Sequence, residues 1–506
     1  MSQIFSIFLN TFQPVMLLSG FFGTLFGVVL GAIPGLNGGI GIAVMLPFTY
    51  TMPPAVGLLF LGGIYMGSGY GGAISAILLN VPGTVNAACT AIEGSCMAKK
   101  GKGKEALYYA VLASCVGGFV GVVALILCTP LLAKLSLRFG PPEMFLVSLC
   151  GLAIVGSMSS GKVLRGIMSA FLGLFLSMIG MQASTGFTRF TFGSKLLLSG
   201  IDTIPAIIGL FAISEMIHQA YVLKNSEEQK INYQIENNIR AVTAIKRMMT
   251  TFRATLLKSS FMGTFIGILP GTGGAIASFL AYSEAKRISK EPEQFGKGAP
   301  DGIVAVESAN NAAVGGSMVP MLGLGIPGST NSAIMLGALT IHGLIPGNQL
   351  FTETPEVAYG FLFGMLLTVV FMGVIGVFGI PLFSQILKVK MKYIIPAVIM
   401  CCLLGAYSSR NSMADVFFAC IFAVIGFVFT KLDIPSAPLL LGLILGGIIE
   451  KNFVKTLSLA NAHNNPMVLY IIKRPLCIGI LAVVLYLIYS NARDGGKAKK
   501  IKKEIN

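Results

Sequence analysis

Long apolar stretches alternate with short polar ones along the chain, and the apolar stretches dominate the pattern. The first 98 residues contain no Lys, Arg or His and one acidic residue, Glu93, while residues 303–387 contain no Lys or Arg. These runs exceed the roughly 20 residues that an α-helix needs to cross a bilayer. The pattern therefore predicts an all-α polytopic membrane protein with roughly 10–12 transmembrane helices, some of them broken or re-entrant.

One polar interruption divides the chain into halves of similar size. Residues 224–258 mix acidic and basic side chains and predict a partly helical cytoplasmic linker between two membrane repeats, residues 1–223 and 259–490. Residues 491–506 form a basic tail, which we also expect on the cytoplasmic side. No basic region precedes the first apolar stretch, so the N-terminus does not resemble a cleaved signal peptide.

Composition narrows the class of protein further. Of 506 residues, 54% are hydrophobic and 11% are charged, against about 25% charge in a typical soluble domain, which excludes a water-soluble enzyme. The net charge of +16 comes from basic clusters between apolar stretches, so it indicates membrane topology rather than nucleic-acid binding. Cysteine and histidine spacings predict no disulfide framework or metal centre. We expect no cofactor except a coupling ion.

Two Pro-Gly elements occur in the same order in both halves. The first reads GAIPGLNGG at 31–39 and GILPGTGG at 267–274. The second reads NVPGTVNAA at 80–88 and GIPGSTNSA at 325–333. Two matched elements in the same order indicate an internal duplication.

Charge placement predicts how the two repeats are oriented. The loop after the first element carries no charge at 50–54, whereas its counterpart at 284–301 is rich in Lys and Arg. The loop after the second element is basic at 99–104, whereas its counterpart at 344–356 carries only acidic charge. Equivalent loops with opposite charge bias are typical of inverted repeats. We therefore expect loops 99–104 and 284–301 on the cytoplasmic side.

Pro and Gly within an apolar stretch interrupt the helix and free backbone N–H and C=O groups. In hydrocarbon these groups are costly, so such breaks occur where they are buried in protein or line a wet cavity. N-termini of half-helices favour an anion, and unwound carbonyls with small polar side chains suit sodium. A packing kink is the alternative explanation for any single break.

These arguments predict two sets of functional residues. The predicted substrate-binding residues are Asn37, Asn80, Gly83, Thr84, Asn86, Gly328, Ser329, Thr330 and Asn331. The predicted ion-binding residues are Pro34, Gly35, Gly38, Pro270, Gly271, Thr272, Gly273, Glu307, Asn310 and Asn311. We expect Asn86 and Asn331 to approach each other around a common cavity, because each lies four residues after the proline of its element.

Glu307 has two interpretations. A carboxylate inside a membrane is expensive and usually functional, but Glu307 could also lie at the interface and only begin a helix. Sodium is favoured over protons as the coupling ion, because the breaks offer neutral oxygens and Glu307 is the one nearby group that could carry a proton.

The motifs together resemble the large permease subunit of tripartite tricarboxylate transporters, the TctA family. The resemblance covers nearly the whole chain and rests on the residues 27–38, 80–103, 282–298, 307–316 and 324–339. One departure is Glu93, where the family pattern more often has Asp. The resemblance implies a multi-pass protein of the bacterial inner membrane.

The same resemblance implies a function and partners. It implies import of a tricarboxylate or other organic carboxylate such as citrate, by sodium or proton symport. The implied partners are a small four-helix membrane subunit and a periplasmic solute-binding protein. An anion-selective channel using the same half-helix sites is the alternative. An enzyme is disfavoured, because no nucleophile–base or metal pattern is visible.

Overall fold

The computed structural model describes residues 2–136, 138–157, 163–182, 186–225, 241–270, 273–386 and 391–482. The first half contains α1 (Ser2–Asn10), α2 (Pro14–Ala32), α3 (Gly38–Thr49), α4 (Pro54–Leu79), η1 (Val85–Ala87), α5 (Ala88–Lys99), α6 (Gly103–Ser136), α7 (Pro141–Ser157), α8 (Val163–Ser177), β1 (Gly180–Met181), β2 (Thr188–Arg189), η2 (Lys195–Leu197), α9 (Thr203–Ile207), η3 (Ile208–Ile213) and α10 (Ser214–Asn225). The second half contains α11 (Ala241–Thr251), α12 (Arg253–Ile268), α13 (Gly273–Ile288), η4 (Pro292–Gln294), α14 (Pro300–Leu324), α15 (Thr330–Ile341), α16 (Asn348–Thr352), α17 (Pro355–Phe378), α18 (Ile380–Ile386), α19 (Met391–Arg410), α20 (Met413–Lys431), α21 (Ala437–Ala462) and α22 (Met467–Ile472).

The predicted all-α polytopic class is confirmed. Among the described residues, seven helical stretches are long and apolar enough to cross a membrane, namely α2, α6, the continuous run α9–η3–α10, α17, α19, α20 and α21. Helices α4 and α14 are also long, with 26 and 25 residues, but they carry many glycines and small polar residues because they are buried at the centre of the bundle. The strands β1 and β2 form one short antiparallel pair.

Helix boundaries follow local chemistry. Proline occupies the first turn of α2, α4, α14 and α17, where its missing N–H has no intrahelical partner to lose. Helix α4 ends at Asn80 and α14 ends at Gly325, both in the left-handed conformation. These two residues occupy equivalent places in the two repeats, so the ends of the long central helices match.

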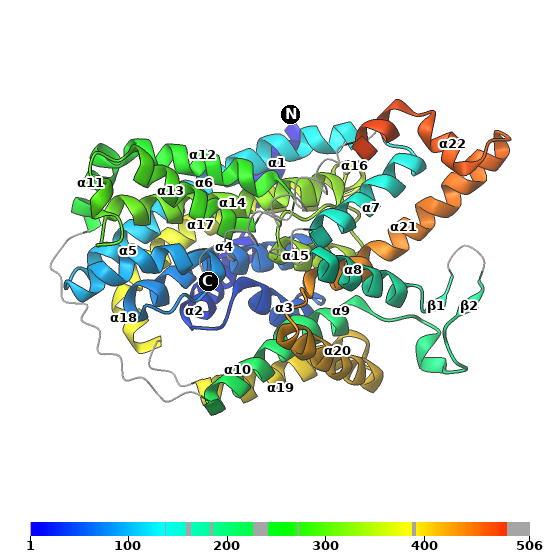
Figure 1. Ribbon diagram of the computed structural model, residues 1–506, viewed down its shortest axis with the longest axis horizontal. Coiled ribbons are helices and arrows are strands. Elements are labelled where there is room, and N and C mark those ends of the chain that lie inside the picture. The colour runs from blue at the N-terminus through cyan, green and yellow to red at the C-terminus, as the bar shows by residue number, and fades with distance from the viewer. Residues whose placement is uncertain are drawn as a thin grey trace, which may run out of the picture.

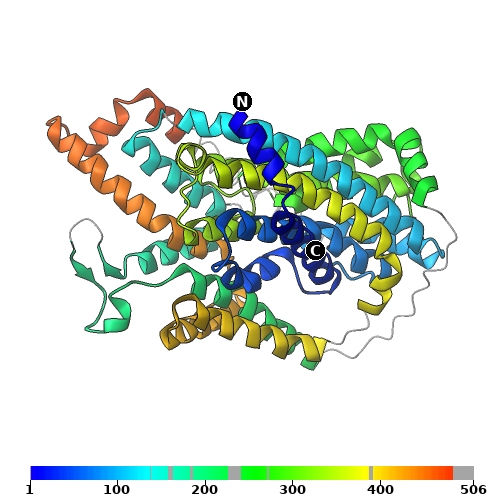
Figure 2. The same cartoon turned by 180° about the vertical axis from the view of Figure 1, so that it is seen from behind.

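The elements are distributed between two ends of the molecule. Helices α5, α11 and α13 gather at one end, and the β1–β2 hairpin and α22 lie at the other (Figure 1). The view from behind shows the same arrangement, with α17 running beside the first-half helices (Figure 2). Helix α11 occupies the second part of the predicted linker. Residues 226–240 of that linker and the predicted tail 491–506 lie outside the described residues.

Helices α2 and α4 pack backbone against backbone. A Cβ atom on Gly23 would lie 2.2 Å from the carbonyl oxygen of Phe60, and one on Gly31 would lie 2.7 Å from that of Ser68. The residue numbers of the contacting pairs rise together in α2 and in α4, so the two helices run parallel. Glycine is required here because any side chain would push the two backbones apart.

The second repeat contains the same packing. A Cβ atom on Gly263 would lie 2.2 Å from the carbonyl oxygen of Ala309, and one on Gly267 would lie 2.7 Å from that of Ala313. Helices α12 and α14 therefore run parallel, like α2 and α4. Since equivalent helices use equivalent glycines, the duplication expected from the Pro-Gly elements is a structural one.

The two repeats are inverted relative to each other. Asn310 Nδ2 donates to the carbonyl oxygen of Gly69 at 3.2 Å, and the hydroxyl groups of Ser317 and Tyr65 lie 3.0 Å apart. In these two contacts the residue number rises in α14 while it falls in α4, so these equivalent helices run antiparallel. The inverted repeats predicted from loop charge are confirmed.

The first break of repeat one, residues 33–37 between α2 and α3, reverses the chain direction. A Cβ atom on Gly38, at the start of α3, would lie 2.2 Å from Ser68 Oγ, whereas Thr49 at its end packs against Gly57. Helix α3 therefore returns toward the start of α4, and α2 and α3 form a re-entrant hairpin. The prediction of re-entrant pieces is confirmed for this element.

The second break has the same backbone pairing in both repeats. After α4 ends, Gly83 N donates to the carbonyl oxygen of Gly72 at 3.4 Å. After α14 ends, Gly328 N donates to that of Ser317 at 3.2 Å. The chain thus folds back about two helical turns before η1 or α15 begins. Some of the backbone groups freed by each break are paired within the protein, as burial in a membrane requires.

Glu93 connects the two repeats at one end of the molecule. Its side chain is fully buried and accepts hydrogen bonds from Tyr282 Oη at 2.7 Å, Gly298 N at 2.7 Å and Ala299 N at 2.8 Å. Gly296 N donates to the same carboxylate. A carboxylate that accepts several backbone N–H groups needs no cationic partner, so Glu93 anchors the loop between α13 and α14.

The two basic loops lie at this same end. Lys100 Nζ donates to the carbonyl oxygen of Lys297 at 2.6 Å, so loop 99–104 touches loop 284–301. Arg247 of α11 forms an ion pair of 3.1 Å with Glu105 nearby. The structure thus places both loops on one side, and the cytoplasmic identity of that side remains a prediction from charge.

The glycine packing gives a direct test of the repeat geometry. Gly27→Ala and Gly263→Ala each introduce a Cβ within 2.4 Å and 2.2 Å, respectively, of a backbone oxygen on the partner helix. We expect each to lower the free energy of unfolding by about 1–3 kcal/mol through overpacking. The thermal midpoint of the purified protein in detergent measures this.

Gly447→Ala is the matched control, because a Cβ there would have no heavy atom within 4 Å. If both central variants unfold at the same temperature as the control, the close approach of these helices is wrong.

Candidate functional site

Site A lies where the N-termini of α3 and α15 meet. It comprises Asn37, Gly38, Gly39, Tyr65, Ser68, Ser317, Ser329 and Asn331. The side chain of Asn331 lies against the first turn of α3, where a Cβ on Gly38 would be 3.1 Å from Asn331 Nδ2 and one on Gly39 would be 2.8 Å from its Oδ1. The site therefore joins the first break of one repeat to the second break of the other.

Both helices at site A are capped by their own side chains. Asn37 Oδ1 accepts from Ile40 N at 3.1 Å, and Ser329 Oγ accepts from Ser332 N at 3.2 Å. Each cap occupies one of the four N–H groups that a helix N-terminus leaves without an intrahelical partner. The remaining N–H groups and the positive ends of the two helix dipoles lie close together, because Asn331 of α15 lies against Gly38 and Gly39 of α3.

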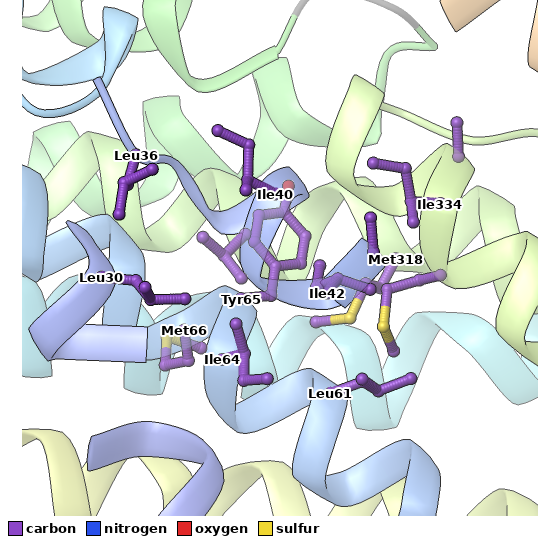
Figure 3. Close-up of a cluster of buried hydrophobic side chains, with 14 of the residues drawn as sticks. Leu30, Leu36, Ile40, Ile42, Leu61, Ile64, Tyr65, Met66, Met318 and Ile334 are labelled. Carbon is purple, nitrogen blue, oxygen red and sulfur yellow. The ribbon is translucent and has the colours of Figure 1, made fainter. Parts of the chain in front are cut away.

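Tyr65 bridges the site from α4. Its hydroxyl group lies 2.7 Å from Ser329 Oγ and 3.0 Å from Ser317 Oγ. The ring lies among apolar side chains of α3, α14 and α15, including Ile40 and Met318 (Figure 3). This apolar surrounding fixes the ring, so the hydroxyl group holds the cap of α15 in place.

Site B is the counterpart of site A in the inverted arrangement. It comprises Gly69, Thr84, Asn86, Gly274 and Asn310. Asn86 Nδ2 donates to Asn310 Oδ1 at 2.8 Å, and a Cβ on Gly274 would lie 2.4 Å from Asn86 Nδ2. Here the first break of the second repeat meets the second break of the first repeat.

The bridging residues of the two sites are equivalent. Tyr65 and Asn310 occupy equivalent positions in the two repeats, because their separation in sequence equals that between Gly83 and Gly328. In both sites the residue on the long central helix therefore contacts the second break of the opposite repeat. None of the side chains named for site A or site B is charged. Among the described residues of the two sites, N–H groups, hydroxyls and amides are therefore the groups that would select a ligand.

A third polar cluster, which we call the Glu307 cluster, lies between α5, α6 and α14. Thr90 Oγ1 and Ser114 Oγ donate to the two carboxylate oxygens of Glu307, the second at 3.1 Å. Asn311 Nδ2 donates to Ser114 Oγ at 2.8 Å. Glu307 is fully buried within the protein, and its placement inside the membrane rather than at the interface stays a prediction.

The predicted residues are divided among these three places. Asn37, Gly38, Ser329 and Asn331 lie in site A, Thr84, Asn86 and Asn310 lie in site B, and Glu307 and Asn311 form the third cluster. Among the described residues, Asn86 contacts Asn310 and Asn331 lies beside Gly38 and Gly39, so each of the two asparagines belongs to a different site.

The other predicted residues lie outside sites A and B and the Glu307 cluster, and two of them, Gly83 and Gly328, pack closely against the backbone of another helix. A Cβ on Gly83 would lie 2.2 Å from the carbonyl oxygen of Gly31, and Gly328 is placed in the same way against Gly267. Asn80 and Thr330 are exposed. Pro34, Pro270 and Gly273 form the first breaks, and Gly35 lies against Gln219 of α10. Gly271 and Thr272 lie outside the described residues.

Sequence reasoning missed Tyr65, Ser317, Thr90 and Ser114. Three of these residues lie inside long apolar helices, and Thr90 lies in the 12-residue helix α5. All four become polar contacts only when helices distant in sequence meet. A weak signal was available for Tyr65, because it is a polar aromatic residue within a run of glycines. Within the described residues, no group of three or more His, Cys, Asp or Glu is placed to hold a metal ion.

Inverted repeats with broken helices that meet at the centre of the bundle are the architecture of secondary transporters. The chain belongs to the tripartite tricarboxylate transporter TctA family, whose model matches residues 17–441. It is thus a member of the family of large membrane subunits of these transporters.

Two similar proteins come from Agrobacterium vitis. An uncharacterized 52.8 kDa protein in the TAR-I ttuC' 3' region is 32% identical over 478 residues, which cover 94% of this chain and 93% of that protein. An uncharacterized protein in the TAR-II ttuC' 3' region is 32% identical over 229 residues, which cover 45% of this chain and 95% of that protein. No solved structure matches the chain.

The geometry of site B predicts the effect of a single methyl group. Gly274→Ala should push Asn86 away from Asn310, because the new Cβ would lie 2.4 Å from the Asn86 amide nitrogen. We expect uptake of substrate to fall by about tenfold or more, since a buried hydrogen-bonded pair is broken.

Gly360→Ala serves as the control, because a Cβ there would have its nearest neighbours at 3.9 Å and 4.0 Å. Both variants should be produced in the membrane in similar amounts. Unchanged transport by Gly274→Ala would show that site B is not part of the transport path.

Proposed function

We propose that this chain is the permease through which an organic carboxylate, such as citrate or another tricarboxylate, enters the bacterial cytoplasm by symport with sodium. The observation that carries the proposal is that breaks from different repeats meet, which we call cross-pairing. Site A and site B each combine the first break of one repeat with the second break of the other. A movement of one repeat against the other changes both sites at once, as alternating access requires.

Recognition of a carboxylate is supported by the chemistry of site A. The N-termini of α3 and α15 present backbone N–H groups, with the Asn331 amide and the Ser329 hydroxyl group beside them. Such groups stabilise an anion through hydrogen bonds and helix dipoles without a fixed positive charge. A site without Lys or Arg can also release its substrate, which transport demands.

Sodium coupling is supported by the neutral oxygens of the breaks. Their backbone carbonyls and the Asn, Ser and Thr side chains match the oxygen ligands that hard cations prefer. Proton coupling would need a titratable group at the centre, and Glu307 is the candidate among the described residues. Sodium coupling and proton coupling therefore predict different effects of substitutions at Glu307.

Orientation and partners follow from charge and from the family. We place the end that contains loops 99–104 and 284–301 in the cytoplasm because of its Lys and Arg residues. A periplasmic solute-binding protein would then deliver the carboxylate to the opposite end, and a small four-helix subunit would pack beside this chain in the inner membrane. The described surface carries many exposed apolar side chains, as contact with lipid and a membrane partner requires.

Uptake of radiolabelled citrate into proteoliposomes that contain the partner subunits tests this proposal. We expect accumulation above the external concentration when an inward sodium gradient is imposed. Asn331→Ala should raise the carboxylate concentration for half-maximal uptake by about tenfold or more, because a hydrogen bond to a charged group is lost. Asn461→Ala, at an exposed position near the end of α21, is the matched control.

Three outcomes would contradict the proposal. Equilibration without accumulation would identify an anion channel. Accumulation driven only by a pH gradient would identify proton symport. Equal effects of Asn331→Ala and Asn461→Ala would remove site A from the substrate path.

A further inference from the structure

Five carboxylates in the described part of the chain are almost completely buried, and four of them have a clear electrostatic partner. Glu105 pairs with Arg247, Glu143 with Arg474 and Asp415 with Arg410, while Glu93 accepts backbone N–H groups. These partners stabilise the charge that burial would otherwise make costly. The fifth is Glu307.

Among the described residues, Glu307 has only neutral side-chain donors, namely two hydroxyl groups and the amide of Asn310. Thr90 and Ser114 donate to its two oxygens, and no Lys, Arg or His among the described residues lies within ion-pair distance of it. A fully buried carboxylate without a cation or several backbone donors is costly in a low-dielectric interior. The position therefore calls for a positive charge that the described side chains do not supply.

Asn311 provides the second, independent observation. Its Nδ2 donates to Ser114, but its Oδ1 is buried without a hydrogen-bond partner, and the residue is fully buried. A Cβ on Gly69 would lie 2.6 Å from this oxygen, so the glycine leaves space for it. An unpartnered carbonyl oxygen in the same cluster as an unneutralised carboxylate adds a second acceptor that lacks a positive partner.

We propose that the Glu307 cluster binds one sodium ion. The ligands are the carboxylate of Glu307, the amide oxygen of Asn311 and the hydroxyl oxygens of Thr90 and Ser114. A hydroxyl group can rotate its proton away and present a lone pair, so these four side chains form an all-oxygen set suited to a hard monovalent cation. A proton would satisfy the carboxylate but would leave the Asn311 oxygen without a partner.

The cluster is adjacent to site B, and this explains how the ion would act on the substrate. Asn310 and Asn311 are consecutive in α14, and both approach Gly69 on α4. Asn310 in turn holds Asn86 of site B. Sodium bound by Asn311 would therefore fix the stretch of α14 that orders site B. This role in coupling rests on the proposed function, whereas sodium binding itself does not.

Sodium-dependent thermal stability of the purified chain in detergent, without any carboxylate, tests the proposal. A ligand that binds only the folded state raises the unfolding midpoint with concentration. We expect sodium chloride to stabilise the wild-type chain relative to choline chloride at equal ionic strength. Glu307→Gln should raise the sodium concentration for half-maximal stabilisation by about tenfold or more, because it removes the one formal charge of the cluster.

Further variants separate binding from damage to the fold. Ser114→Ala and Thr90→Val should weaken the sodium response, and Thr90→Ser should retain it. Glu105→Gln is the matched control, because it neutralises a buried carboxylate outside the cluster and should retain the wild-type response. In choline chloride, Glu307→Gln should be at least as stable as the wild type, since an unpaired buried charge is removed.

Several results would overturn the sodium site. They are a wild-type chain that does not respond to sodium, a Glu307→Gln variant that responds like the wild type, and stabilisation by acid alone that Glu307→Gln abolishes. The last result would identify a proton site. If sodium binding is observed as expected but proteoliposomes do not accumulate carboxylate, the proposed function fails and the sodium site stands.

Discussion

Backbone groups freed inside a bilayer must be sheltered by protein, and this constraint organises the whole structure. Each half of the chain contains two breaks, and the glycines of the second breaks, Gly83 and Gly328, approach the backbones of α2 and α4 and of α12 and α14, respectively. The close contact is possible only because glycines such as Gly31 and Gly267 face the breaks. Once the breaks are sheltered in this way, the N-termini of α3 and α15 meet inside the protein.

The inverted symmetry then gives the breaks their partners. Because α4 and α14 run antiparallel, the first break of each repeat lies beside the second break of the other. Site A and site B are therefore shared between the repeats rather than contained in one of them. The two sites differ in detail, since Tyr65 takes the place that Asn310 holds in the other repeat. Their similar geometry and different polarity permit different ligands.

The sequence was sufficient to predict the class of fold, the four breaks and the inverted orientation, because Pro-Gly pairs and loop charges are local signals. It was insufficient to predict which breaks meet. The expectation that Asn86 approaches Asn331 rested on their equal spacing from a proline, and such a spacing does not specify which segments pack together. The role of Glu93 was missed for the same reason, since its partners lie some 200 residues away. Long-range contacts depend on packing, which no single segment encodes.

Cross-pairing of the breaks is the central claim, and disulfide cross-linking in a cysteine-free background tests it most directly. Asn37→Cys combined with Asn331→Cys places two thiols on either side of Gly39. The account predicts that this pair cross-links readily under mild oxidation, whereas Asn37→Cys combined with Asn86→Cys, from the same repeat, does not. Cross-linking of the second pair and not the first would contradict the account.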